Sequence, residues 1–140
     1  MAIFNKFEKF VEDLGDGIHQ LKAAGHTLNA YLSNAAPSAS LDAIKTDLAE
    51  ITNENGYTAP VDIQNDASRT GLVLTVTAVD AVITASGGTV GPFQYVVIYN
   101  DTPTSPADPL VGWYDYGSAI TLQDGESLTI NFGASFFTIT

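Results

Sequence analysis

The sequence predicts a mainly β protein with one N-terminal α-helix: a β-sandwich of jelly-roll type, α+β overall. Three observations lead to this fold class. From Tyr57 onward, short segments alternate apolar and polar side chains with the period of a strand. Pairs that favour turns, such as Gly87-Gly88 and Asp124-Gly125, separate these segments. The first residues, in contrast, repeat apolar side chains every three or four positions, which is the period of a helix.

An amphipathic helix is predicted over Asn5–Ala23. Gly15 and Gly17 fall inside this pattern, and a glycine within a helix costs about 1 kcal/mol relative to alanine. The two glycines therefore either kink the helix or end it near Leu14. Residues 1–25 are assigned to this helix, which packs on the β-region or extends from it. Its apolar stripe consists of Ile3, Phe7, Phe10, Val11, Leu14, Ile18 and Leu21.

Residues 26–140 are predicted to form the β-sandwich, with a short helical insertion near residues 40–52. The whole chain is expected to be a single domain. Alternation predicts a first strand over Thr27–Ser33, and Asn55-Gly56 is the expected chain reversal before the main β-region. The further predicted strands are Thr58–Gln64, Gly71–Val79, Ala81–Ala85, Gln94–Tyr99, Leu110–Tyr116, Ser127–Phe132 and Phe136–Ile139.

Two of the predicted strands are apolar on both faces. They lie within residues 95–101 and 110–116. Strands at the centre of a sheet that is covered on both sides have this composition. One cover is expected to be the opposite sheet. The other is expected to be the N-terminal helix or a neighbouring subunit, so the pattern also favours an oligomer.

The composition argues against acid–base and nucleophilic catalysis in the second half of the chain. Residues 71–140 contain no Lys, Arg, His or Cys. We therefore expect a binding or assembly protein with no catalytic residue and no cofactor. The formal net charge of −11 disfavours nucleic acid and anionic membrane surfaces as partners. The sequence also lacks a run of about 18 apolar residues that would span a membrane.

Few residues are candidates for a metal site. A zinc site needs three or four protein ligands, and the chain offers two histidines, His19 and His26, with no cysteine. Both histidines are expected to have solvated or capping roles. Asp101, Asp108 and Asp115 surround one loop and could bind Ca²⁺ through carboxylate oxygens. Aspartate beside Thr, Ser and Pro is also ordinary turn chemistry, and no metal is expected.

A central segment resembles a known group of proteins. It runs from Gly91 to Gly117 and contains Tyr-Val-Val-Ile-Tyr-Asn-Asp, a Thr/Pro loop, Asp-Pro-Leu-Val-Gly and Trp-Tyr-Asp-Tyr. Further matching elements are Phe-x-x-Phe-Val-Glu-Asp-Leu from Phe7, Asn-Ala-Ala-Pro from Asn34 and Asp-Gly-Glu from Asp124. Together, and in order, these elements cover nearly the whole chain. The sequence is similar to small structural proteins of tailed-bacteriophage virions, among them capsid decoration (cement) proteins.

The resemblance implies a non-enzymatic role. A decoration protein binds the outer surface of the shell formed by the phage major capsid protein and stabilises that shell, commonly as a homotrimer. The implied location is the capsid exterior of the virion, after synthesis in the host cytoplasm. Related β-modules also occur in tail and fibre proteins, so binding of a host-surface glycan is the alternative.

The contact surfaces expected for such a protein are apolar and aromatic. Aromatic residues between positions 95 and 116 are expected in the core or at a subunit interface, or in a sugar-stacking platform under the glycan-binding alternative. A third function, polysaccharide hydrolysis, would need paired carboxylates such as Asp115 and Glu126 around a sugar. The residues expected to contact other copies or the capsid are Phe7, Phe10, Leu14, Tyr95, Tyr99, Trp113, Tyr114 and Tyr116.

Overall fold

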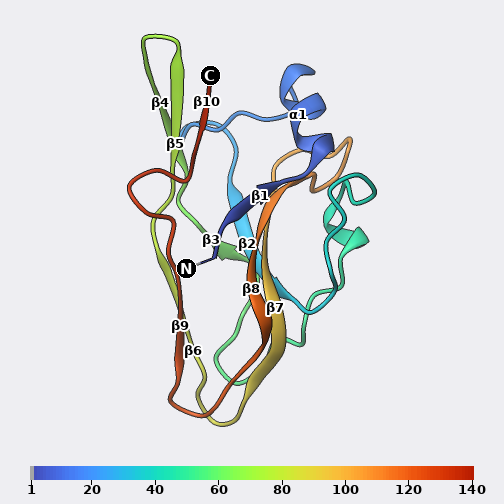
Figure 1. Ribbon diagram of the computed structural model, residues 1–140, viewed down its shortest axis with the longest axis vertical. Helices are drawn as coiled ribbons and strands as arrows, with labels where there is room; N and C mark the ends of the chain where they lie inside the picture. The colour runs from blue at the N-terminus through green and yellow to red at the C-terminus, as the bar shows by residue number, and fades with distance from the viewer. Residues whose placement is uncertain (1) are drawn as a thin grey trace.

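A five-stranded antiparallel sheet is the framework of the chain in the computed structural model of Figure 1, which describes residues 2–140. Its strands are, in order across the sheet, β1 (Phe4–Lys6), β8 (Leu110–Leu122), β7 (Val90–Asn100), β2 (Leu28–Ser33) and β3 (Val61–Asp62). The two longest strands, β7 and β8, pair with each other near its middle. The first strand, β1, pairs with β8 and so joins the N-terminal end of the chain to this sheet.

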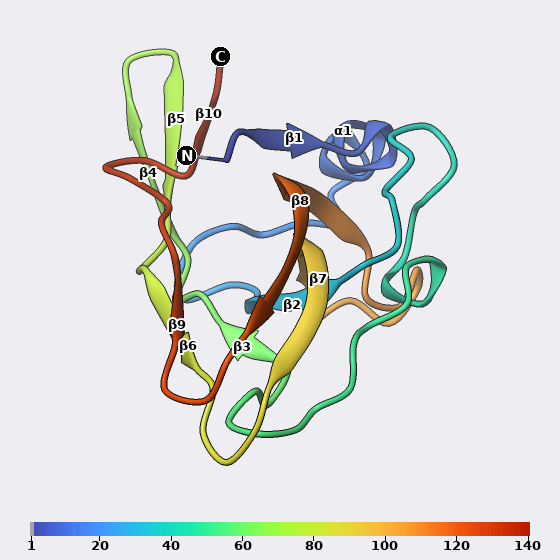
Figure 2. The same ribbon diagram turned by 60° about the horizontal axis from the view of Figure 1, so that its bottom comes forward.

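Two smaller antiparallel sheets lie together on one side of the five-stranded sheet (Figures 1 and 2). In chain order their strands are β4 (Asp66–Thr70), β5 (Val73–Thr77), β6 (Ala81–Thr84), β9 (Ser127–Ile130) and β10 (Phe137–Ile139). One sheet has the order β10-β5-β4, and the other pairs β6 with β9. Because β6 follows β5 and β10 follows β9, the small sheets continue each other as a second β-layer. The predicted mainly β class is confirmed.

The main hydrophobic core lies between the five-stranded sheet and the second β-layer. Its aromatic part centres on Phe4 of β1, whose ring centre lies 4.6 Å from that of Phe136 and 5.5 Å from that of Tyr114. Val76 of β5 and Ile98 of β7 are fully buried in the same core. Each such apolar side chain stabilises the fold by roughly 1.5–3 kcal/mol. The contact between Phe4 and Phe136 therefore holds the two ends of the chain together.

The outer face of the five-stranded sheet is covered by the same chain. Residues 34–57 lie over it and contain one 3₁₀ turn, η1 (Lys45–Asp47). The hydroxyl of Tyr31 lies 3.1 Å and 3.2 Å from two carbonyl oxygens of this segment, to which it donates. The ring of Phe7 packs on that of Trp113, with 4.6 Å between their centres. The predicted burial of the central strands on both faces is confirmed, and the second cover belongs to the chain itself.

The N-terminal helix is shorter than predicted, and the expectation of one helix over Asn5–Ala23 is wrong. The helix α1 spans Glu8–Gly15, and the residues before it form β1. Gly17 has a φ of +77°, a left-handed conformation that glycine adopts without strain, and its N–H donates to the carbonyl of Leu14 at 3.2 Å. The observed helix therefore follows the alternative in which the glycines end it early.

Other elements also differ from the prediction: β3 has two residues where Thr58–Gln64 is predicted, and β7 and β8 are longer than predicted. The pattern does not predict β4, a mostly exposed and polar strand that exists because it pairs along its length with β5. The insertion near residues 40–52 contains only the single turn η1. The reversal at Asn55-Gly56 is confirmed, with φ values of 52° and 97°. Within residues 2–140, no helix has the length and apolar character needed to cross a bilayer.

Candidate functional site

The aromatic residues of β7 and β8 do not form one surface. Successive side chains of a strand point to opposite faces of a sheet. Trp113 therefore lies on the outer face against Phe7, whereas Tyr114 points to the second β-layer, where its ring centre lies 5.9 Å from that of Phe132. The expectation of a single sugar-stacking platform built from all these aromatic residues is therefore wrong.

Half of the eight residues expected to contact a partner are buried inside the chain itself. Exposed fractions of only 0–6% are found for Phe7, Phe10, Tyr99 and Tyr114. These side chains fill the protein's own core, so they offer almost no surface to a second protein, and the expectation that they contact a neighbouring subunit or the capsid is wrong. The partly exposed residues, which remain contact candidates, are Leu14, Tyr95, Trp113 and Tyr116.

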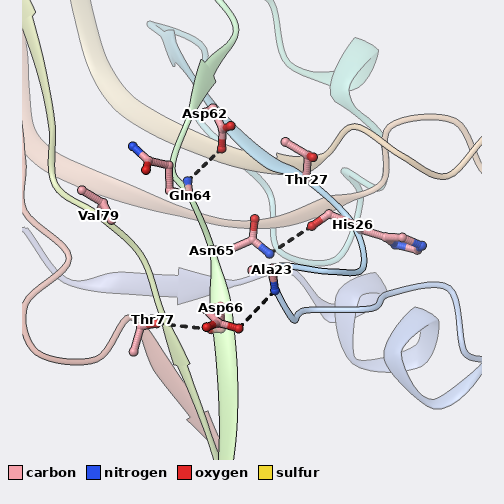
Figure 3. A pocket seen from close by; sticks show the side chains of 9 residues that line it. All are labelled: Ala23, His26, Thr27, Asp62, Gln64, Asn65, Asp66, Thr77 and Val79. Atoms are coloured by element: carbon pink, nitrogen blue, oxygen red, sulfur yellow. Dashed lines mark hydrogen bonds between the residues drawn. The ribbon is translucent and has the colours of Figure 1, made fainter.

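A polar pocket of about 440 Å³ lies beside the start of β2 (Figure 3). Three segments that are far apart in the sequence line it: residues 23–27 of the connection from α1 to β2, residues 62–66 between β3 and β4, and residues 77–79 at the end of β5. Most of the side chains that face it are polar. The pocket is open to solvent.

Two carboxylates are held at the polar pocket by backbone N–H groups. Oδ1 of Asp66 accepts hydrogen bonds from the N–H groups of Ala23, at 3.1 Å, and Ala67, at 2.8 Å. These bonds hold the pKa of Asp66 below its ordinary value. Oδ1 of Asp62 accepts a bond from the N–H of Gln64 at 2.8 Å. Within residues 2–140, Oδ2 of each carboxylate has no hydrogen-bond partner, so each is available to a cationic ligand.

The buried Asn65 builds the floor of the polar pocket. Its Oδ1 accepts a hydrogen bond from the N–H of Leu28 at 2.9 Å. Its Nδ2 donates to the carbonyl oxygens of Leu21, at 2.8 Å, and His26, at 3.1 Å. The side chain therefore ties the connection after α1 to the start of β2 and to the link before β4. Both hydrogens of the Asn65 amide group are bonded within the chain, so Asn65 positions the pocket wall. The groups available to a ligand are those of the neighbouring residues.

The two histidines share the amide of Asn100. Its Nδ2 lies 3.0 Å from Nδ1 of His19 and 2.9 Å from Nδ1 of His26. The N–H of Thr102 donates to Oδ1 of the same amide at 3.2 Å, which fixes the amide orientation. Both Nδ1 atoms therefore accept, and neither carries a proton. Burial, followed by the neighbouring His26, lowers the pKa of His19 to about 4.

A second cavity, of about 260 Å³, lies between β8 and β9 and is called the tyrosine cavity here. Its walls include Tyr114 and Tyr116 of β8, Thr129 of β9 and Asn131 just after β9. Burial raises the pKa of both tyrosine hydroxyls, so these groups are neutral hydrogen-bond donors at physiological pH. An aromatic wall beside a few polar groups is an arrangement that suits a small polar ligand with an apolar face.

The two carboxylates considered for catalysis, Asp115 in β8 and Glu126 before β9, are used in local hydrogen bonds. Oδ1 of Asp115 accepts bonds from Gln94 Nε2, at 3.0 Å, and from the N–H of Gly117, at 2.7 Å. These bonds lower the pKa of Asp115, the direction opposite to that required of a general acid. Oε1 of Glu126 accepts from the N–H of Gln123 at 2.7 Å. Among residues 2–140, no group of three or more His, Cys, Asp or Glu side chains is arranged to hold a metal ion.

The hairpin formed by β4 and β5 projects beyond the rest of the molecule (Figure 1). Its two-residue turn is Gly71-Leu72, where Gly71 has a φ of +61°. The exposed fraction of the Leu72 side chain is 96%, the highest among the exposed large apolar residues. We call residues Arg69–Val73 the hairpin tip. The sequence predicts a strand that begins at Gly71, but it does not predict the preceding strand β4. The projecting hairpin is therefore not predicted.

The polar pocket was not predictable from the sequence either. Its three segments meet only because the side chains of Asn65 and Asp66 hold the connection after α1 beside the start of β4. Asp62 and Asp66, four residues apart, give no recognisable motif. Comparison of the chain with protein-family models, with curated proteins and with solved structures finds no match.

Proposed function

We propose that this chain is a non-enzymatic structural protein of a phage virion, a capsid decoration protein that binds the outer surface of the major capsid protein shell and stabilises it. It acts as a homo-oligomer, a trimer, on the capsid exterior, and its subunits are made in the host cytoplasm. The ordered resemblance of the sequence to such proteins supports this role. The fold we propose for the two β-layers is a sandwich of jelly-roll type.

The observation that carries the proposal is the exposed Leu72 at the hairpin tip. Burial of a leucine side chain stabilises a protein or complex by roughly 1.5–3 kcal/mol. Leu72 is exposed in the isolated chain, so this stabilisation can be gained only on contact with another molecule. The tip lies beyond five consecutive pairs between β4 and β5, and the pairing of β10 with β5 stops at Leu74, so the turn itself is left without a strand partner. A projecting apolar group on a paired hairpin is suited to insertion into a neighbouring protein of an assembly, such as an adjacent copy on the shell.

The base of the hairpin is firmly attached, so the position of the tip is defined. The N–H of Phe136 donates to the carbonyl of Val76 at 2.7 Å, and Val76 itself is fully buried. The N–H of Val79 donates to the carbonyl of Ile63 at 2.8 Å. These contacts join the hairpin to the C-terminal strand and to the β3–β4 link. A tip held in this way loses little conformational entropy when it binds.

Co-sedimentation tests the proposed role directly. Purified protein is mixed with shells assembled from the major capsid protein of the same genome, and the bound fraction and thermal stability of the shells are measured. We expect binding and a higher melting temperature of the shells. Leu72→Asp should weaken binding roughly 10–100-fold, which corresponds to the loss of one buried leucine. Leu41→Asp, at a residue 82% exposed, is the matched control and should bind as the wild type does.

Absence of any shell binding by the wild-type protein would refute the decoration role. The alternative is a tail or fibre module that binds a host glycan, and the tyrosine cavity is the observation that favours it. Aromatic rings stack on sugar faces, and Thr129 and Asn131 supply polar groups at the same place. A glycan array tests this function. Binding that is lost in Tyr116→Ala but kept in Leu72→Asp would support it over capsid decoration.

A further inference from the structure

We propose that the hairpin tip of one copy docks in the polar pocket of a second copy, so that copies of this chain join head to tail. This inference rests on the proposed homo-oligomer and specifies its contact. It arises from two surfaces that complement each other in charge and in apolar character. The chain carries them at different places, which allows each copy to present the tip to one neighbour and the pocket to another.

The hairpin tip combines an apolar and a cationic group. Arg69 is the only arginine of a chain with a net charge of −11. Its Nη1 donates to the carbonyl of Gly71 at 2.9 Å, so the guanidinium lies at the turn that carries Leu72. The ion pairs within residues 2–140 involve Lys9 and Lys45, and none involves Arg69. The remaining donors of the guanidinium are therefore available to carboxylates of another molecule.

The polar pocket offers the complementary groups. Asp62 and Asp66 are each fixed through Oδ1 and keep Oδ2 free, and a carboxylate is the preferred partner of a guanidinium. Val79, half-exposed on the pocket wall, provides an apolar surface for a leucine. The pocket volume of about 440 Å³ is in the range of cavities that hold compact ligands. Lys22 lies near Asp66 and reduces, without cancelling, the negative charge of this region.

Geometry requires that tip and pocket come from different copies. The pocket lies at the base of the hairpin, next to Thr77 and Val79 (Figure 3), whereas Leu72 is in the turn at the far end of the hairpin. The five residues of β5 separate them by roughly 17 Å at about 3.4 Å per residue. A contact that joins different patches on two copies is heterologous, and repetition of such a contact closes into a ring when the rotation permits. A trimer of the proposed kind is one such ring.

Disulfide trapping tests the contact, because the chain has no cysteine of its own. The double variant Leu72→Cys, Val79→Cys places one thiol on the tip and one at the pocket. A disulfide requires Cα atoms within about 7 Å, so the two thiols of one copy cannot join. We expect oxidation to link copies at least tenfold faster than in the control variant Leu41→Cys, Val79→Cys. Equal rates for the two variants would overturn the proposal.

A charge reversal supplies an independent readout. Addition of Arg69→Glu to the trapping variant should slow cross-linking at least fivefold, and added salt should slow the unreversed variant in the same direction. Cross-linking that is insensitive to both changes would overturn the role of Arg69 and the carboxylates. The result is separable from the decoration role: shell binding without tip-to-pocket cross-links refutes this contact alone, whereas cross-links without shell binding refute the decoration role alone.

Discussion

Acidification should destabilise the fold through His19, and the structure gives both the sign and the size of the effect. The side chain is only 7% exposed, and its Nδ1 accepts a hydrogen bond from Asn100. Its pKa is about 4 in the folded chain, against an ordinary value of 6.5. The unfolded chain therefore binds a proton more readily between these two values. Stability from this residue is fully present above pH 6.5 and is lost as the pH falls towards 4.

A pKa lowered from 6.5 to about 4 corresponds to a loss of at most about 3.4 kcal/mol in unfolding free energy. That loss is a large part of the 5–15 kcal/mol typical of a domain. Carboxylates such as Asp66 and Asp115, whose pKa values are lowered in the fold, also lose stabilising contacts in acid. The contribution of His19 must therefore be measured as a difference between two proteins.

Urea unfolding of the wild type and of His19→Gln, at several pH values from about 7.5 to about 4, isolates this contribution. Glutamine keeps an acceptor for Asn100 but does not titrate. We expect the variant to be less stable near neutrality, and the difference in unfolding free energy to shrink by up to about 3 kcal/mol as the pH falls. Curves that stay parallel over the whole range would refute the assignment of His19 as a neutral buried acceptor.

Two further predictions concern packing. Gly56→Ala should destabilise the fold by about 1–3 kcal/mol more than Gly87→Ala, because a Cβ at position 56 collides with the carbonyl oxygen of Thr84, whereas the one at position 87 meets open space at a similar positive φ. Equal losses in chemical denaturation would contradict this. Phe7→Ala should cost about 3–5 kcal/mol, and Val11→Ala in the exposed part of α1 less than about 0.5 kcal/mol. Similar melting temperatures for these two variants would contradict the burial of the N-terminal segment.

Local patterns predict the parts of this fold in which local burial determines structure. The apolar runs in β7 and β8 predict central strands, and both are buried as expected. The alternation before Ser33 likewise predicts β2. The start of the N-terminal helix is predicted wrongly because contacts with distant parts of the chain determine the structure there. Phe4 lies one residue before the predicted helix, yet it pairs opposite Tyr114, more than a hundred positions away, and packs on Phe136. No local period carries information about such a partner.

The same limit explains the missed candidate site. Asp66 and Arg69 look like loop residues because β4 is mostly exposed and polar, and only its pairing with β5 makes it a strand. The split of Trp113 and Tyr114 to opposite faces follows from strand geometry and was predictable from their adjacency. The use of Tyr114 in the core was not, because it depends on the second β-layer lying against β8.

The strength of the tip-to-pocket contact indicates where oligomers should be found. Burial of Leu72 contributes about 2 kcal/mol, and a charge-assisted bond from Arg69 contributes about 1.5–3 kcal/mol. Their sum corresponds to a dissociation constant in the millimolar range, before the entropy of association is subtracted. A shell that holds copies at neighbouring positions supplies an effective concentration of that order. The contact should therefore be sparsely occupied in dilute solution and become occupied on the capsid, where the same weak contact, repeated around a ring, resists the release of any one copy.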